Sequence, residues 1–224
     1  MLNKLNPAQR EAVTYLDGPL LVLAGAGSGK TRVITHKIAY LVNECGYEPR
    51  NIAAITFTNK AANEMRERVG DLLKNTSTKG LVVSTFHSLG MNILRKEAAL
   101  LGYKPQFSIF DSGDTWKIFG ELTNSGDKQE IRDLQTQISN WKSAFISPQQ
   151  AAEIADNDET KLHARIYSRY QETLRAYQAV DFDDLIHLPV VLFKQHPEAL
   201  LRWQLKLRYL LVDEYQDTND CQYQ

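Results

Sequence analysis

The sequence predicts an α/β protein in which the strands of a parallel sheet alternate with helices. Residues 20–24 form an apolar run typical of a strand buried on both faces, and a helical pattern begins after Thr31. The runs at 52–56 and 81–84 are each followed by a helical pattern in the same way. A fourth run, at 209–212, ends in acidic residues. Strands that alternate with helices indicate a parallel sheet with crossover helices.

The first of these runs leads into a segment that fits a phosphate-binding loop. Its residues are Ala24, Gly25, Ala26, Gly27, Ser28, Gly29, Lys30 and Thr31. Glycines let successive N–H groups point at an anion, and the following helix directs its positive end there. Lys30 would contact the β- and γ-phosphates, and the Thr31 hydroxyl would bind Mg²⁺. The alternative is a glycine-rich turn with an incidental lysine, and the strict loop pattern has glycine where this chain has Ala24.

Composition limits the class of protein. The 224 residues are 43% hydrophobic, which is enough for the core of one large or two small domains. No run approaches a membrane span and residues 1–10 lack the apolar region of a signal peptide, so we expect a cytoplasmic protein. Cys45 and Cys221 are expected to be ordinary reduced thiols. With a net charge of −1, any nucleic-acid binding depends on a local groove.

The N-terminal residues 5–13 predict a short helix with Asn6 as its cap and Pro7 in its first turn. Gln9 lies on the polar side of this helix. A glutamine amide can pair with the N6 and N7 groups of adenine. Taken alone, Gln9 is more simply interpreted as a solvated helix residue.

Two turns that follow strands carry similar residues. Phe57, Thr58, Asn59 and Lys60 follow the run at 52–56, and Thr85, Phe86 and His87 follow the run at 81–84. Ligands of open parallel sheets bind at this edge, and a phenylalanine beside polar and basic groups suits single-stranded nucleic acid. The alternative is that Asn59 caps a helix, Phe57 belongs to the core and His87 is a structural hydrogen-bonding residue.

Helical patterns replace the alternation of strands and helices between residues 91 and 195. They cover 115–122, 130–144, 148–154 and 162–176, and indicate an inserted helical subdomain. Its expected core residues are Trp116, Trp141, Tyr167 and Tyr170.

The acidic segment at 180–185 resembles a metal site at first sight. We favour a structural interpretation, with Asp181 as N-cap and Asp183 and Asp184 in the first turn of a helix that reaches about residue 193.

The run at 209–212 ends in a second candidate catalytic group. In P-loop nucleotidases an aspartate at such a strand end lies beside the loop threonine and holds Mg²⁺, a role that fits Asp213. Glu214 would then orient and deprotonate the attacking water, and Gln216 would sense the γ-phosphate. An acidic strand end alone is weak evidence for a metal site, but together with the upstream phosphate loop it is strong evidence.

These motifs together resemble a known family. AGAGSGKT, TFTNKAA, STFH and VDEYQD in this order, preceded by LNPAQ, are similar to the N-terminal part of UvrD/Rep-like superfamily 1A DNA helicases. ISNWK at 138–142 and FDDLI at 182–186 fit the same branch. Ala24 is usual in this family, and the resemblance covers the whole chain.

The resemblance implies a RecA-like parallel sheet, domain 1A, formed by residues 1–86 and 196–224, with a helical subdomain 1B at 87–195. It implies 3'-to-5' translocation on single-stranded DNA, driven by ATP and Mg²⁺, in replication or replication restart. Replication or repair proteins are possible partners, and a membrane is not. The implied catalytic residues are Lys30, Asp213, Glu214 and Gln216. ATP would contact Gln9 and residues 24–31, Mg²⁺ would contact Thr31 and Asp213, and DNA would contact Phe57, Thr58, Asn59, Lys60, Thr85, Phe86 and His87.

The resemblance also implies parts that these 224 residues do not contain, namely a second RecA-like domain and arginines at the γ-phosphate. An arginine of this kind contributes about 10³ to 10⁵ in rate. We therefore expect a fragment that binds ATP-Mg and single-stranded DNA weakly and does not unwind DNA. A non-catalytic nucleotide- and DNA-binding module is the alternative. A P-loop GTPase is disfavoured, because Ala62 stands where its N-K-x-D signature needs an acid.

Overall fold

The computed structural model describes residues 2–74, 76–124 and 126–224, which form two units. The first unit consists of the described residues up to Phe86 together with Leu201–Asp217. The second consists of His87–Leu200 and Thr218–Gln224. None of the helices in these ranges is both long and apolar enough to cross a membrane.

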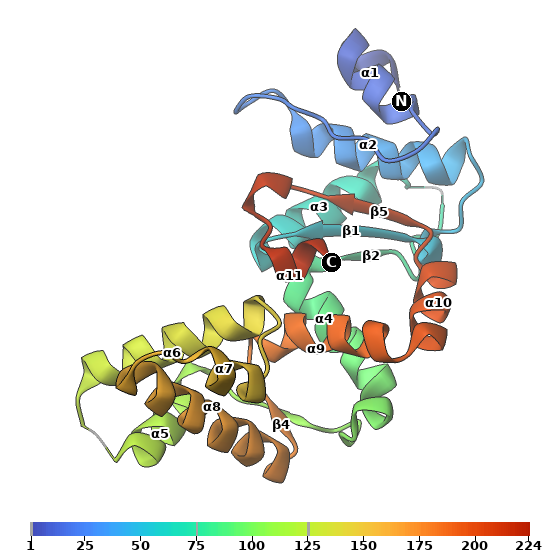
Figure 1. Ribbon diagram of the computed structural model, residues 1–224. Helices are drawn as coiled ribbons and strands as arrows, with labels where there is room; N and C mark the ends of the chain where they lie inside the picture. Colours follow the sequence, from blue (N-terminus) through green and yellow to red (C-terminus); the bar gives the residue numbers. More distant parts are fainter. Residues whose placement is uncertain (1, 75, 125) are drawn as a thin grey trace. The chain divides into compact units, whose positions relative to one another are not determined.

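The first unit is built on a three-stranded parallel sheet (Figure 1). Its strands are β1 (Ile52–Thr56), β2 (Val82–Thr85) and β5 (Tyr209–Val212), in the order β2-β1-β5. Ala54 in the central strand is opposite Val83 on one side and Leu211 on the other. All residues of β1 are buried, as the expected apolar run requires. The predicted α/β class with a parallel sheet is confirmed.

Two long helices cover one face of this sheet. They are α2 (Lys30–Asn43) and α3 (Asn59–Leu72), and the shorter α1 (Pro7–Thr14) packs on α2. Ile38 of α2 and Met65 of α3 share a core with Ile52 and Ala54 of β1. Residues two apart in a strand lie on the same face, so this core occupies one side of the sheet.

The expected strand at 20–24 is absent, and this prediction was wrong. The segment carries no strand assignment, and among the described ranges no strand pairs with it. Leu21 and Leu23 are 62% and 86% exposed. An apolar run favours burial, but a strand forms only where a neighbour accepts its backbone hydrogen bonds. Nothing in the run itself supplies that neighbour.

The strand at 209–212 is present but less buried than expected. β5 lies at the edge of the sheet, and Leu210 is 56% exposed. Only one side of an edge strand is paired, so its hydrophobic pattern overstates its burial.

The second unit is mostly helical. α4 (Phe86–Glu97) leads into it, and α10 (Pro197–Lys206) returns the chain to the first unit. Its other helices are α5 (Ser112–Thr123), α6 (Lys128–Ser143), α7 (Pro148–Ile154), α8 (Asp158–Ala176), α9 (Asp184–Gln195) and α11 (Asp220–Tyr223). The short 3₁₀ helices of the chain are Leu2–Lys4, Pro49–Asn51, Ala98–Leu101 and Tyr215–Asp217.

The helical patterns predicted between 115 and 176 are confirmed. Of the four expected core aromatics, Trp141, Tyr167 and Tyr170 are buried, and Trp116 is only partly buried. Trp141 stacks on Tyr167 with ring centroids 5.8 Å apart. The core of α5 to α8 therefore combines aliphatic side chains with buried aromatic rings.

A short parallel pair in this unit was not predicted. β3 (Ser108–Ile109) pairs with β4 (Ala179–Val180). The expectation that residues 91–195 are helical without strands was therefore wrong at these two short segments. Two-residue strands are too short to produce a periodic signal, and their pairing depends on residues that are distant in sequence.

Two helical glycines are expected to respond oppositely to alanine. A Cβ added at Gly90 in α4 would overlap the carbonyl oxygen of Leu185. Gly90→Ala should lower the free energy of unfolding by about 3 kcal/mol, because neither backbone can yield easily. An added Cβ at Gly70 in α3 meets nothing within 4 Å. Gly70→Ala should raise stability by about 0.5 to 1 kcal/mol through helix propensity. Urea unfolding measures both, and a neutral Gly90→Ala would contradict the close approach.

Candidate active site

The phosphate loop has the backbone that its sequence predicted, although the strand before it is missing. Gly27 and Gly29 have φ values of 74° and 89°, which residues with a side chain rarely adopt. Gly29 is the N-cap of α2, and no side chain among the described residues caps this helix. The first N–H groups of α2 are thus left for an outside acceptor, and a helix start with unused donors is a favourable anion site.

Lys30 lies between the loop and the acidic end of β5. Its ammonium donates to the carbonyl of Ala24 at 3.3 Å and is 4.0 Å from Glu214 Oε2. Gln216 Nε2 donates to the same carboxylate oxygen at 2.6 Å. Glu214 itself has a φ of 49°, a left-handed backbone that residues with a side chain rarely adopt. The structure therefore brings the candidates Lys30, Glu214 and Gln216 together.

Asp213 and Thr31 provide adjacent oxygen ligands. The N–H of Asp213 donates to Ile55 of β1 at 2.9 Å, which fixes the strand end, and its side chain is buried. Burial, and then the charge of Glu214, raise the pKa of the Asp213 carboxyl, while a hydrogen bond from Thr31 opposes the rise. A hydroxyl beside a carboxylate fits Mg²⁺, which takes its other ligands from phosphate and water. No cluster of three or more His, Cys, Asp or Glu suited to a metal exists in the described ranges.

Gln9 is held against the phosphate loop. Its Oε1 accepts the N–H of Asn6 at 3.2 Å, in a capping box at the start of α1, and its Nε2 donates to the Ser28 carbonyl at 2.9 Å. Gln9 is thus half-exposed with its amide fixed by two hydrogen bonds, and its role toward adenine stays a prediction. The amide keeps one free lone pair and one free N–H, which are the groups that adenine pairing requires.

The candidate DNA residues of the first unit lie around two aromatic rings. Phe57 and Phe86 have ring centroids 5.5 Å apart, and both are half-buried. Thr58, and not Asn59, caps α3, because its hydroxyl accepts the N–H of Ala61 at 3.1 Å. Asn59 is instead the first residue of α3, and it is exposed.

Two further candidates in this set differ in accessibility. Lys60 is exposed in the first turn of α3. Thr85 is only 6% exposed, so its side chain supports the strand end more than it presents a surface.

His87 opens the second unit beside an aromatic residue that the sequence reasoning missed. Its ring lies 5.6 Å from Phe182, which is 53% exposed. Burial lowers the pKa of His87, against the charge of Asp183, so the neutral ring prevails at pH 7. In the sequence, Phe182 contributes to the resemblance through FDDLI but is not predicted to bind DNA. An exposed aromatic residue between two acids was the available signal.

A buried charge cluster connects the two short family motifs. The ammonium of Lys142, from ISNWK, donates to Asp181 at 2.6 Å and to Asp184 at 2.8 Å. The two aspartates also exchange backbone-to-side-chain hydrogen bonds with each other, and Tyr170 donates to Asp181 at 2.8 Å. Asp183 directly precedes α9 but forms no side-chain cap, whereas Asp181 accepts the N–H of Asp184 at 2.9 Å, so the predicted capping role of Asp181 is confirmed. The structural interpretation of this acidic segment holds, with Lys142 as the partner that the sequence did not reveal.

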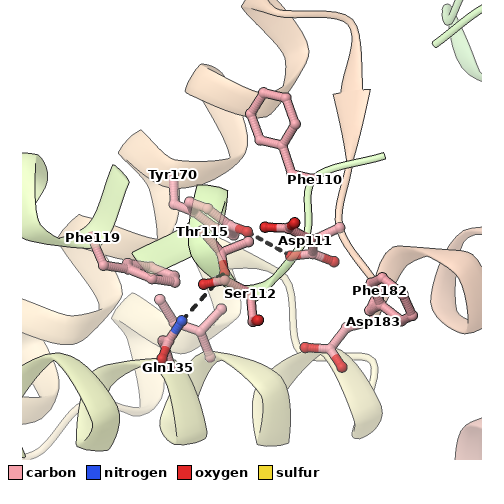
Figure 2. Close-up of a pocket in the computed structure, with 11 residues that line it drawn as sticks. Phe110, Asp111, Ser112, Thr115, Phe119, Gln135, Tyr170, Phe182 and Asp183 are labelled. Atoms are coloured by element: carbon pink, nitrogen blue, oxygen red, sulfur yellow. Dashed lines mark hydrogen bonds between the residues drawn. The ribbon is translucent and has the colours of Figure 1, made fainter. Parts of the chain in front are cut away.

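A cavity of about 390 Å³ adjoins this cluster in the second unit (Figure 2). Phe119, Gln135 and Tyr170 are among the residues that line it. Its buried carboxylate, Asp181, is already bonded to Lys142 and Tyr170. None of the nucleotide candidates lines this cavity.

The fold and the loop together define an α/β protein of the P-loop class with a RecA-like sheet. The chain belongs to the UvrD/REP helicase N-terminal domain family, whose pattern matches residues 5–224. It is 52% identical to the ATP-dependent DNA helicase Rep of Escherichia coli, over 99% of this chain and 33% of that protein.

More distant relatives carry a second helicase name. The ATP-dependent DNA helicases PcrA of Leuconostoc citreum and Staphylococcus aureus are each 44% identical, over 100% of this chain and 30% and 31% of those proteins. The chain thus spans about a third of the length of the relatives that it matches. The resemblance drawn from the motifs is confirmed.

Proposed function

We propose that this chain forms part of an ATP-dependent, 3'-to-5' single-stranded DNA translocase or helicase that acts in DNA replication or replication restart. The observation that carries the proposal is the meeting of Lys30 and Thr31 with Asp213 and Glu214, across 181 intervening residues. In this proposal residues 1–86 and 196–224 belong to domain 1A, and residues 87–195 form subdomain 1B.

Each side chain has a separate role in the proposed ATP site. Gln9 binds adenine, the loop N–H groups and Lys30 bind the phosphates, and Thr31 and Asp213 hold the metal. A bound Mg²⁺ neutralises charge on the β- and γ-phosphate oxygens. Glu214 accepts a proton from the attacking water, and Gln216 keeps the Glu214 carboxylate oriented through its 2.6 Å hydrogen bond.

Single-stranded DNA is the proposed second ligand. Phe57, Phe86 and His87 would stack on bases, and Phe182 joins them because of its exposed ring beside His87. Thr58, Asn59 and Lys60 would contact the backbone, with Thr85 supporting them. Because His87 is neutral at pH 7, its contribution is stacking and hydrogen bonding rather than charge.

By itself the chain is proposed to bind ATP-Mg and DNA weakly, without unwinding. Its family relatives are about three times as long, and phosphoryl transfer needs cationic groups at the γ-phosphate beyond Lys30. The alternative, a non-catalytic nucleotide- and DNA-binding module, is less consistent with a glutamate placed 4.0 Å from the loop lysine.

ATP hydrolysis, measured with and without single-stranded DNA, tests this proposal. We expect detectable ATP binding but no turnover above a Lys30→Ala background. DNA-stimulated turnover by this chain would contradict the proposed inactivity of the isolated piece. Turnover that stays absent even when a second RecA-like domain is added would favour the non-catalytic module.

Phe57→Ala is expected to weaken binding of an oligothymidylate about 5- to 100-fold, because one stacked base contributes about 1 to 3 kcal/mol. Tyr177→Ala serves as the control, since it removes a ring that is 66% exposed and has no proposed DNA contact. Fluorescence anisotropy with a labelled oligonucleotide measures both variants. Equal affinities for Phe57→Ala and the wild type would remove Phe57 from the proposed path.

A further inference from the structure

Lys37 is a buried lysine that the proposed function does not use. It lies on α2 and is only 4% exposed. Its ammonium donates to the carbonyl of Ala12 at 3.3 Å and to the carbonyl of Tyr15. Ala12 is in the last turn of α1 and Tyr15 is the C-cap, where carbonyls lack partners within the helix and attract cations.

The surroundings of Lys37 make simple packing a poor explanation. No carboxylate in the described part of the chain forms an ion pair with it, and the ring centroid of Tyr209 is 5.6 Å from the ammonium. Burial lowers the pKa of Lys37, which reflects the cost of enclosing its charge. An apolar residue of similar length would fill the same space without that cost. The two hydrogen bonds to carbonyls are what an apolar residue could not provide.

Both helices that Lys37 joins belong to the proposed ATP site. α2 begins at Lys30, and Lys37 lies two turns further along the same helix. α1 carries Gln9, whose Nε2 bonds to Ser28 and would be 2.9 Å from a Cβ added at Gly29. Gln9 therefore joins the N-terminal end of α1 to the loop by a hydrogen bond. Lys37 joins the C-terminal end of α1 to α2, the helix that follows the loop.

We propose that Lys37 is a positioning residue for adenine recognition, which fixes α1 on α2 so that Gln9 keeps its place beside the phosphate loop. The inference rests on the proposed function, because it assumes that Gln9 and the loop bind ATP. Lys37 touches no part of the nucleotide in this account. It acts through α1 alone.

The geometry also predicts how the effect depends on the base. Asn6 occupies one lone pair of the Gln9 amide and Ser28 occupies one N–H, so the amide cannot reverse its two ends without losing both bonds. Adenine, with its 6-amino donor and N7 acceptor, matches that fixed orientation. Inosine triphosphate has a 6-oxo group instead and should bind less tightly. Loss of the Lys37 bonds should reduce this preference and leave phosphate binding unchanged.

The experiment compares Lys37→Met with the wild type, using ATP, inosine triphosphate and inorganic tripolyphosphate as ligands in titration calorimetry. Lys37→Met is expected to weaken ATP binding about 5- to 10-fold. This is the effect of losing about one charge-assisted hydrogen bond, and it reaches ATP only through the position of α1. The ratio of ATP to inosine triphosphate affinity should fall toward one, with tripolyphosphate affinity unchanged. Lys37→Arg keeps a cationic donor and should restore the ratio. Lys74→Met, an exposed lysine near the end of α3, is the matched control.

A second measurement keeps the test independent of nucleotide. Hydrogen exchange of the α1 amides should accelerate in Lys37→Met, while the amides of α3 keep their wild-type rates and so report an intact fold. Unchanged α1 exchange, or an unchanged affinity ratio in Lys37→Met, overturns the inference alone. A wild type that binds none of the three ligands overturns the proposed function and the inference with it.

Discussion

Lys142→Met is expected to destabilise the second unit by about 3 to 5 kcal/mol, the usual cost of breaking a buried ion pair from one side. Lys142 is 1% exposed and compensates two aspartates that are also buried. Methionine fills the space but leaves both carboxylates without their cation. Denaturant unfolding monitored by the fluorescence of Trp116 and Trp141, the tryptophans of this unit, measures the loss.

The Lys142 prediction has a matched control and a rescue. Lys128→Met changes an exposed lysine on the same helix, α6, and should shift stability by less than about 0.5 kcal/mol. Adding Asp181→Asn and Asp184→Asn to Lys142→Met removes the uncompensated charge and should recover part of the loss. A Lys142→Met protein as stable as the wild type would show that the cluster is not the main support of this unit.

The same cluster predicts a dependence on pH. Burial, and then the neighbouring charge of Asp181, raise the pKa of Asp184 to about 6, above its usual value near 3.9. Its folded form therefore holds a proton more tightly than its unfolded form, and its contribution to stability is lost as the pH rises through about 6. Lys142 limits this loss by favouring the ionised carboxylate. Lys142→Met should consequently gain more stability than the wild type when the pH falls from 7 to 5.

Much of the fold could be predicted because the signals are local. β1 and α7 have the expected bounds, and Asn6 caps α1 as predicted, since apolar periodicity and capping chemistry act within a few residues. The failures that concern strands depend on distant partners. Residues 20–24 are apolar enough for a strand but have no neighbour to pair with in the described structure. The pair β3 and β4 joins residues about 70 positions apart.

The candidate site divides in the same way. The loop motif alone predicts the roles of Lys30 and Thr31. The role of Asp213 as a metal ligand is predicted only when its strand is considered together with that loop. The position of Gln9 could be predicted only in part, because its contact with Asn6 is a local cap and its contact with Ser28 is a tertiary hydrogen bond. Lys142 carried no signal of its own, because a lysine that compensates aspartates some 40 residues away looks like any surface lysine in sequence.

Lys30→Ala is expected to weaken MgATP binding about 100-fold. The ammonium would form charge-assisted hydrogen bonds to two phosphates, each contributing about 1.5 to 3 kcal/mol. Its loss has a second effect, because the Glu214 carboxylate 4.0 Å away would then face the γ-phosphate without a neighbouring cation. Titration calorimetry with MgATP measures the change, and Lys161→Ala, an exposed lysine on α8, is the control.

The double variant Lys30→Ala with Glu214→Gln separates these two effects. If repulsion by Glu214 contributes, the neutral amide should recover part of the affinity lost in Lys30→Ala, while Glu214→Gln alone should change binding little. A strictly additive result would assign the whole loss to the phosphate contacts of Lys30. An unchanged affinity in Lys30→Ala would show instead that ATP binds without this loop, since the helix N-terminus and the glycine backbone cannot replace a full positive charge at the γ-phosphate.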